Sequence, residues 1–196
     1  MKLILASNSK SRKNIFDMIG WKYEVITSNV EEKSNATDPK QYVLELSKAK
    51  ANSVASQIKE KALIVSADSI AYMDNKKFEK PKTKEEAFHF IKEMSGKTNY
   101  AITGVTIKDL YQNKEISFVE TTEVHFKNVI DEDILWYIEN EKFLLERAGY
   151  SIAGKTSIFI DNIVGDYYNI VGLPISKLYS KLNELGYTIS DFDMKE

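Results

Sequence analysis

The sequence predicts an α/β fold, and two features of the chain carry that prediction. In the first half, short apolar runs suited to buried strands alternate with longer stretches of helical periodicity. In the second half, residues 98–107 and 115–124 alternate between apolar and polar side chains, as two long strands would. With 196 residues, of which 43% are hydrophobic, the chain is long enough for one well-buried core or two closely packed lobes. We therefore expect residues 1–196 to form a single domain.

The charge balance and the counts of cysteine and histidine indicate which ligands this protein can bind. The chain has 27 basic and 29 acidic side chains and a net charge of -2, so no overall positive field would gather a nucleic acid polymer, although a local cationic pocket for a small anion remains possible. There is no cysteine and there are two histidines, His89 and His125, which argues against thiolate and multi-histidine metal sites. Any metal should be held by oxygen atoms.

The first nine residues are apolar over only a few positions before polar residues intervene. Such a stretch is too short for a signal sequence or a membrane span. We expect a cytoplasmic protein that does not use a membrane as a partner.

The first predicted unit is a strand at residues 3–6, a polar turn, and a helix at about residues 10–19. The unpaired backbone amides at the start of a helix can bind an anion, and the hydroxyls of Ser7 and Ser9 could assist them. Ordinary capping of the helix by serine is the alternative explanation. Arg12 falls on the same helical stripe as the apolar Ile15 and Phe16, which predicts that its side chain points along the core side.

A second strand is predicted at residues 23–27, and a long helix at about residues 39–59. Val43, Ser47, Ala51, Val54 and Ile58 share one face of that helix, and Lys50 projects from the middle of the same face. A lysine in such a position is costly unless it meets an anion, which could be a protein carboxylate or a ligand phosphate.

Residues 62–70 form an apolar run that reads as a buried strand, with Asp68 at its C-terminal edge, where α/β proteins tend to present chemistry. Taken alone, Asp68 could simply close a turn. The run continues into a predicted hairpin that ends at Lys80, which is held extended by the following proline. This hairpin should place Asp68 and Lys80 at comparable heights on neighbouring arms.

The rest of the chain predicts helices at residues 83–94 and 131–141, and a closing helix that starts at Pro174. Two glycine-flanked segments, residues 147–154 and 163–174, permit a close backbone approach, either to a flat ligand or to another strand.

Several fragments, taken in their order and spacing, resemble the Maf family, the septum-formation-associated nucleoside triphosphate pyrophosphatases related in fold to the inosine triphosphatases. The resemblance runs essentially end to end. The fragments that carry it are Leu5-Ala6-Ser7-Asn8-Ser9 with Arg12, Val30-Glu31-Glu32, Leu46 with Lys50-Ala51, Ala67-Asp68-Ser69, Lys80-Pro81, Met94-Ser95-Gly96, Thr103-Gly104-Val105, Gly165-Asp166-Tyr167-Tyr168 and Val171-Gly172-Leu173-Pro174. The fold this implies has a long, twisted mixed sheet with flanking helices and two lobes around a central cleft.

The resemblance implies hydrolysis of a nucleoside triphosphate between its α and β phosphates, giving a monophosphate and pyrophosphate with the help of Mg²⁺ or Mn²⁺. Asp68 matches the catalytic acid that accepts a proton from the attacking water. The positions that match the family's other polar active-site residues are Ser9, Arg12, Glu32, Lys50 and Lys80. We interpret the three cations as a charge clamp and Glu32 with Asp68 as metal ligands, because phosphoryl chemistry needs positive charge and an oriented water.

Three departures from the family pattern concern the substrate. Members that prefer dTTP and UTP typically carry arginine, threonine and glutamine at the positions of Ser11, Ser69 and Ala153. We therefore expect a pyrimidine or modified nucleotide without fixing which. A catalytically idle, nucleotide-binding regulator of septum formation is the alternative hypothesis. The resemblance also suggests a homodimer.

Overall fold

The structure of the chain is a computed structural model that describes residues 1–31, 33–78, 80–142, 144–146 and 150–192. The chain divides into two compact units. Unit 1 contains Met1–Ser69, Thr103–Glu120 and the segment from Gly172 onward, and unit 2 contains Ile70–Ile102 and Thr121–Val171. These two units match the two lobes expected from the sequence. The cleft expected between the lobes stays a prediction.

Within the described residues the strands form one seven-stranded sheet with the order β2-β1-β3-β5-β6-β7, and β4 pairs with β3. β1 is parallel to both β2 and β3, whereas β4 is antiparallel to β3 and β7 is antiparallel to β6. The predicted mixed sheet is therefore confirmed. The strands are β1 (Leu3–Leu5), β2 (Glu24–Val25), β3 (Leu63–Met73), β4 (Lys76–Phe78), β5 (Thr98–Asp109), β6 (Lys114–Phe126) and β7 (Ile160–Val164).

The α-helices of the described residues are α1 (Lys10–Met18), α2 (Pro39–Gln57), α3 (Lys84–Met94), α4 (Asp131–Asn140), α5 (Tyr167–Val171) and α6 (Ile175–Glu184). The described residues also form three short 3₁₀ helices, Leu144–Glu146, Lys155–Phe159 and Ile189–Asp191. The helices predicted from periodicity are present, within one or two residues at each end for most of them. None of the described helices combines the length and the apolar character that a bilayer crossing requires.

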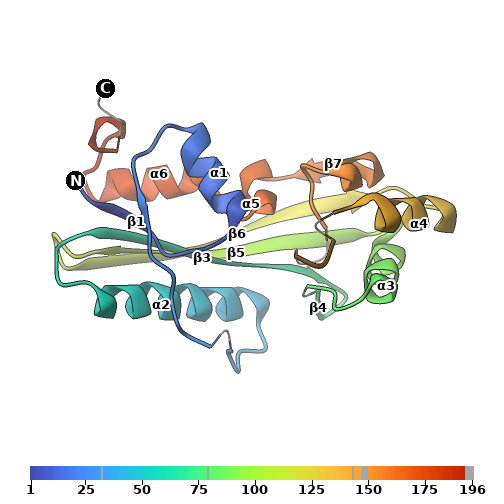
Figure 1. Ribbon diagram of the computed structural model, residues 1–196, viewed down its shortest axis with the longest axis horizontal. Helices are drawn as coiled ribbons and strands as arrows, with labels where there is room; N and C mark the ends of the chain where they lie inside the picture. The colour runs from blue at the N-terminus through green and yellow to red at the C-terminus, as the bar shows by residue number, and fades with distance from the viewer. Residues whose placement is uncertain (32, 79, 143, 147–149, 193–196) are drawn as a thin grey trace. The chain divides into compact units, whose positions relative to one another are not determined.

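In unit 1, α2 covers one face of the sheet, and α1 and α6 cover the other (Figure 1). Most residues predicted to face inward on α2, including Val43, Ser47 and Lys50, are buried. Ile58, also predicted to face inward, lies just past the end of the helix and is half-buried. One hydrophobic cluster of this unit joins α2 to the first strands through Ile4, Ala6, Val54, Ala62 and Ile64. Burial of these side chains fixes the helix against the strands.

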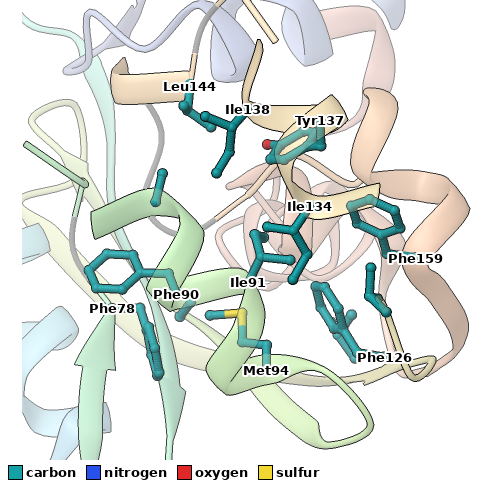
Figure 2. Close-up of a cluster of buried hydrophobic side chains, with 14 of the residues drawn as sticks. Phe78, Phe90, Ile91, Met94, Phe126, Ile134, Tyr137, Ile138, Leu144 and Phe159 are labelled. Carbon is teal, nitrogen blue, oxygen red and sulfur yellow. The ribbon is translucent and has the colours of Figure 1, made fainter. Parts of the chain in front are cut away.

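Unit 2 has its own hydrophobic cluster, in which α3 and α4 contribute facing side chains (Figure 2). The inward face predicted for α3 is confirmed, because Ala87, Phe90, Ile91 and Met94 are all buried. Thr83 caps this helix by accepting a hydrogen bond from the Glu86 amide. The other labelled members of the cluster are Phe78, Phe126, Ile134, Tyr137, Ile138, Leu144 and Phe159.

Two strand predictions need correction. The strand expected at residues 23–27 has only the two residues Glu24 and Val25, both exposed, because it is an edge strand with a single partner. Asp68 was predicted at the C-terminal edge of its strand, but β3 runs from Leu63 to Met73 without a break, so Asp68 lies in the middle of the strand. The strand enters the predicted hairpin through Asp74 and Asn75, whose φ angles are 49° and 61°, the left-handed pair that suits a two-residue hairpin turn.

Candidate active site

The site begins where β1 ends beside β3. Leu5 is paired with Val65, and the Ala6 amide donates to the Val65 carbonyl over 2.8 Å. The chain then leaves the sheet through Ser7, Asn8 and Ser9 and enters α1 at once, while β3 continues to Asp68. The polar turn therefore leaves the sheet beside the stretch of β3 that carries the acid.

The Ser9 side chain does not cap α1, so the capping explanation for this serine is not supported. Ser9 occupies the N-cap position of α1, but its side chain makes no capping hydrogen bond. The Ser7 hydroxyl accepts instead, from the Ser9 amide over 3.2 Å. Since the first amides of a helix have no partner within the helix, they stay suited to a negatively charged group.

Arg12 is buried, with 9% of its surface exposed, as its place on the apolar stripe of α1 predicted. Its Nε donates to the carbonyl of Gly172 over 2.9 Å. Its two terminal nitrogens donate to hydroxyls, Nη1 to Ser7 over 3.1 Å and Nη2 to Ser69 over 3.0 Å. Partners on three separate segments fix the plane of the guanidinium.

Lys50 meets a protein carboxylate, which was one of the two partners expected from its buried position. Its Nζ donates to Oδ1 of Asp68 over 2.6 Å, and the side chains are only 8% and 11% exposed. A buried charge pair must offset a large desolvation cost, so its retention deep in a fold is more informative about chemistry than a surface pair.

The helix that carries Lys50 is fixed to the sheet by backbone contacts. The Ser66 hydroxyl donates to the Ser47 carbonyl of α2 over 2.7 Å. Because Ser66 and Asp68 are two residues apart on a strand, they point to the same face. The contact of Ser66 with Ser47 therefore holds α2 where Lys50 can reach Asp68. Gly104 of β5 also lies against α2, where a Cβ would come within 2.5 Å of the Val43 backbone.

Arg12 and Lys50 approach β3 from opposite faces. Successive side chains of a strand alternate, so Asp68 points to the side of α2 and Ser69 to the side of α1. The sequence predicted both cations around the acid. In the structure Lys50 contacts Asp68 directly, and Arg12 contacts the adjacent residue, Ser69.

The other residues predicted for the site are not brought to Asp68 by any described contact. Ser11 is half-buried on α1 in unit 1. Lys80, just beyond β4, and Ala153 are exposed residues of unit 2. Glu32 lies outside the described residues. Their roles in binding and catalysis stay predictions.

A divalent cation at this site would have to be bound by oxygen atoms. Among the described residues, no group of three or more His, Asp or Glu side chains is arranged to hold a metal ion. Mg²⁺ is commonly bound through one or two carboxylates together with substrate phosphates. The Asp68 carboxylate is a donor of that class, so the site fits a cation shared with a phosphate ligand.

Sequence reasoning missed two residues that hold the site together. Gly172 supplies the carbonyl that accepts from Arg12, and its φ of +116° is a conformation that favours glycine. Thr103 of β5 is fully buried, and its hydroxyl lies 2.9 Å from that of Ser69. Both belong to fragments that carried the family resemblance, but the sequence gives no sign of which side chain each would face.

The fold and the site define a class of protein, an α/β protein that presents a buried acid–lysine pair beside a polar turn at the start of a helix. The fold is that of the Ham1 protein of Staphylococcus aureus, with a TM-score of 0.53 and 15% identity over 94% of this chain and 100% of that one. The HAM1 protein of Coxiella burnetii gives a TM-score of 0.51 and 14% identity over 94% and 99% of the two chains. The chain itself belongs to the family described as Maf-like protein, whose family model matches residues 2–185.

Curated relatives cover nearly the whole chain. The dTTP/UTP pyrophosphatase of Thermoanaerobacter sp. (strain X514) is 41% identical over 182 residues, which is 93% of this chain and 95% of the relative. The dTTP/UTP pyrophosphatase of Carboxydothermus hydrogenoformans is 39% identical over 187 residues, 95% of this chain and 100% of the relative. The recognition of the family from the sequence is confirmed.

Proposed function

We propose that this protein hydrolyses a pyrimidine nucleoside triphosphate, dTTP or UTP, to the monophosphate and pyrophosphate. Family membership and relatives that carry the name dTTP/UTP pyrophosphatase support the substrate class. Of the two substrate classes that the sequence left open, they favour the pyrimidine nucleotides over modified ones.

The observation that carries the chemistry is the buried pair of Lys50 and Asp68. In the proposed reaction the oxygen of a water molecule forms a bond to the α-phosphorus, while the bond from that phosphorus to the bridging oxygen breaks. Asp68 accepts the proton of the water, and pyrophosphate leaves. Lys50 orients the carboxylate through its bond to Oδ1 and adds positive charge where negative charge develops.

The polar turn holds the phosphates in this proposal. The guanidinium of Arg12, the hydroxyls of Ser7 and Ser9 and the first amides of α1 supply donors for phosphate oxygens. The Ser7 hydroxyl already accepts twice, from Arg12 and from the Ser9 amide. A hydroxyl has one proton to donate, so Ser7 can present that proton to an anion.

Glu32 and Asp68 would hold Mg²⁺ or Mn²⁺ in the loaded enzyme. When bound, such a cation offsets the charge of the phosphate oxygens. Lys80, which matches a polar active-site position of the family, is proposed as a further positive charge of the clamp on that ground alone.

A substrate panel tests the proposal. The purified protein is incubated with dTTP, UTP, CTP, dATP, GTP and a set of modified triphosphates, each with Mg²⁺ or Mn²⁺, and both pyrophosphate and orthophosphate are quantified. We expect pyrophosphate and nucleoside monophosphate, with dTTP and UTP as the best substrates. Release of orthophosphate and a nucleoside diphosphate would exclude the proposed bond cleavage. Tight nucleotide binding without any turnover would instead support the idle regulator of septum formation.

A further inference from the structure

Two consecutive cations of α1 reach back to the polar turn that precedes the helix. The Nη1 of Arg12 donates to the hydroxyl of Ser7 over 3.1 Å. In the same way, the Nζ of Lys13 donates over 2.8 Å to Oδ1 of Asn8, the next residue of the turn. Each contact spans five positions of the chain, within unit 1. The first two residues of the turn therefore each hold a positively charged group.

Lys13 keeps capacity for a ligand after this contact. An ammonium group has three protons and can only donate, and the described residues supply one acceptor, the amide oxygen of Asn8. No described carboxylate forms an ion pair with Lys13. Lys13 is half-buried and Asn8 is exposed, so the ammonium lies on the solvent side of the turn. Its other protons can reach an anion that enters from solvent.

The charge at this end of α1 is the reverse of what a helix prefers. The first turn of a helix carries a partial positive charge, so acidic residues are favourable there and cations are not. α1 has no acidic residue in its first turn, and Arg12 and Lys13 occupy its third and fourth positions. An anion bound at the turn would offset both the cations and the helix dipole.

We propose that Lys13 is a further substrate-binding residue, which donates to a phosphate oxygen of the nucleotide while Asn8 holds its ammonium group at the turn. The inference rests on the proposed function, in which Arg12, the serines of the turn and the first amides of α1 bind the phosphates. Because Lys13 would contact phosphate alone, its loss should weaken the binding of every nucleotide equally and leave the base preference unchanged.

Lys13→Met tests the contact through steady-state kinetics with dTTP, UTP and CTP, and through calorimetric binding of inorganic triphosphate with Mg²⁺. Inorganic triphosphate has no base, so it reports the phosphate contact alone. We expect KM for each nucleotide and Kd for inorganic triphosphate to rise roughly three- to tenfold, the size of one charge-assisted hydrogen bond, with kcat within about twofold of wild type. The rise should be smaller at high salt, because salt screens an exposed charge.

Thermal unfolding separates substrate binding from a structural role. We expect the thermal midpoint of Lys13→Met to equal or exceed that of wild type, because the variant removes a cation from the positive end of a helix. Lys13→Arg keeps the charge and should keep Kd within about threefold of wild type. Lys114→Met is the matched control, since Lys114 also donates to a side-chain amide, that of Gln112 over 2.9 Å, but at the turn between β5 and β6. It should leave Kd unchanged.

Asn8→Ala tests the role of the amide that holds Lys13. Alone, it should raise Kd for inorganic triphosphate by about two- to threefold, because the ammonium group must then be ordered by the ligand. In a Lys13→Met background it should have no further effect. An additive loss would contradict the role proposed for Asn8.

The result that overturns the inference is an unchanged Kd for inorganic triphosphate in Lys13→Met, whether or not the thermal midpoint falls. An equal rise of Kd in Lys114→Met overturns it too, since any surface charge would then have the same effect. The proposed function fails separately, if wild-type protein releases no pyrophosphate from any nucleotide, and the calorimetric comparison can still be made in that case.

Discussion

At the scale of residues, the buried pair of Lys50 and Asp68 combines a stability cost with the chemical use proposed for it. Removing two charges from water is expensive, and their attraction repays that cost only with good geometry. The contact of 2.6 Å between Nζ and Oδ1 has that geometry. A fold that only needed stability could fill the same space with apolar side chains, which supports the catalytic role proposed for the pair.

Asp68→Asn should abolish turnover and leave nucleotide binding intact. The amide has nearly the same shape but cannot accept the proton of the attacking water, so we expect kcat to fall by at least roughly 100-fold. Steady-state kinetics check the expected loss of turnover, and equilibrium binding of the same nucleotide checks that affinity is retained. Asp17→Asn on the exposed side of α1 is the control and should leave the rate unchanged. An undiminished rate in Asp68→Asn would remove this residue from the mechanism.

Lys50→Met should destabilise the protein by about 3 kcal/mol, because it leaves the Asp68 carboxylate buried without its partner. The double variant Lys50→Met with Asp68→Leu should recover part of that loss, since no buried charge remains. Urea unfolding of both proteins at neutral pH measures the difference. Lys59→Met, at an exposed position after α2, is the control. A loss below about 0.5 kcal/mol in Lys50→Met would show that the pair is solvated in solution.

Thr156→Val should stabilise the protein. The Thr156 side chain is fully buried, and its hydroxyl has no hydrogen-bond partner among the described residues. Valine has the same shape without the unsatisfied polar group, so the gain should be about 1 kcal/mol. The matched control is Thr122→Val, whose equally buried hydroxyl donates to the Asp166 carbonyl and whose loss should destabilise by a similar amount. Thermal unfolding of the two variants gives the comparison, and a loss of stability in Thr156→Val would contradict the prediction.

At the scale of elements, α2 is fixed by its backbone rather than by side chains alone. It begins at Pro39, after Asp38 accepts a capping hydrogen bond from the Gln41 amide over 2.7 Å. Its first turns then lie directly on Gly104, and Ser66 donates to its Ser47 carbonyl. This close docking delivers Lys50 to Asp68.

Gly104→Ala should displace α2 and lower both stability and activity. The new Cβ would lie 2.5 Å from the carbonyl carbon and oxygen of Val43, so the helix must move outward. Overpacking of this kind costs about 1–3 kcal/mol, and kcat should fall because Lys50 moves with the helix. Gly154→Ala is the control, since its nearest contacts are at 3.5 Å and its backbone is extended. Equal free energies of unfolding of the two variants in urea would show that α2 can move away from the new Cβ without cost, which contradicts the prediction.

At the scale of the whole molecule, both units contain tyrosines whose folded environment favours the neutral phenol. In unit 1, burial and a hydrogen bond to Asp17 raise the pKa of Tyr23 to about 12. Burial also raises the pKa of Tyr187 to about 12, and its hydroxyl donates to Asp109. In unit 2, burial raises the pKa of Tyr150 well above its ordinary value.

These tyrosines predict a loss of stability at alkaline pH. Above pH 10, the ordinary value for tyrosine, the unfolded chain releases phenol protons that the folded chain still holds, so unfolding becomes more favourable as pH rises. The stabilising contribution is complete below about pH 10 and is lost as pH approaches about 12. Urea unfolding at pH 8, 9, 10 and 11 measures this slope. Tyr187→Phe should flatten it, and a free energy of unfolding that stays constant from pH 10 to 11 would contradict the assignment.

Much of the fold follows from local pattern. The periodicity that predicted α1, α2 and α3 also predicted that Arg12 and Lys50 face inward, and the structure confirms both positions. The weakest prediction was β2, because an exposed edge strand has no buried face and therefore no apolar pattern. The enzyme class came from the order of the family fragments, and the names of the relatives agree with it.

The sequence by itself determined most of the helices, their inward faces and the buried strand that carries the acid, because each depends on short-range periodicity. Only the tertiary structure decided which groups meet. The pairing of Lys50 with Asp68, the carbonyl of Gly172 on Arg12 and the contact of Ser69 with Thr103 join residues 18 to 160 positions apart. Contacts over such separations depend on strand register and on how closely helices dock, and no local pattern encodes either.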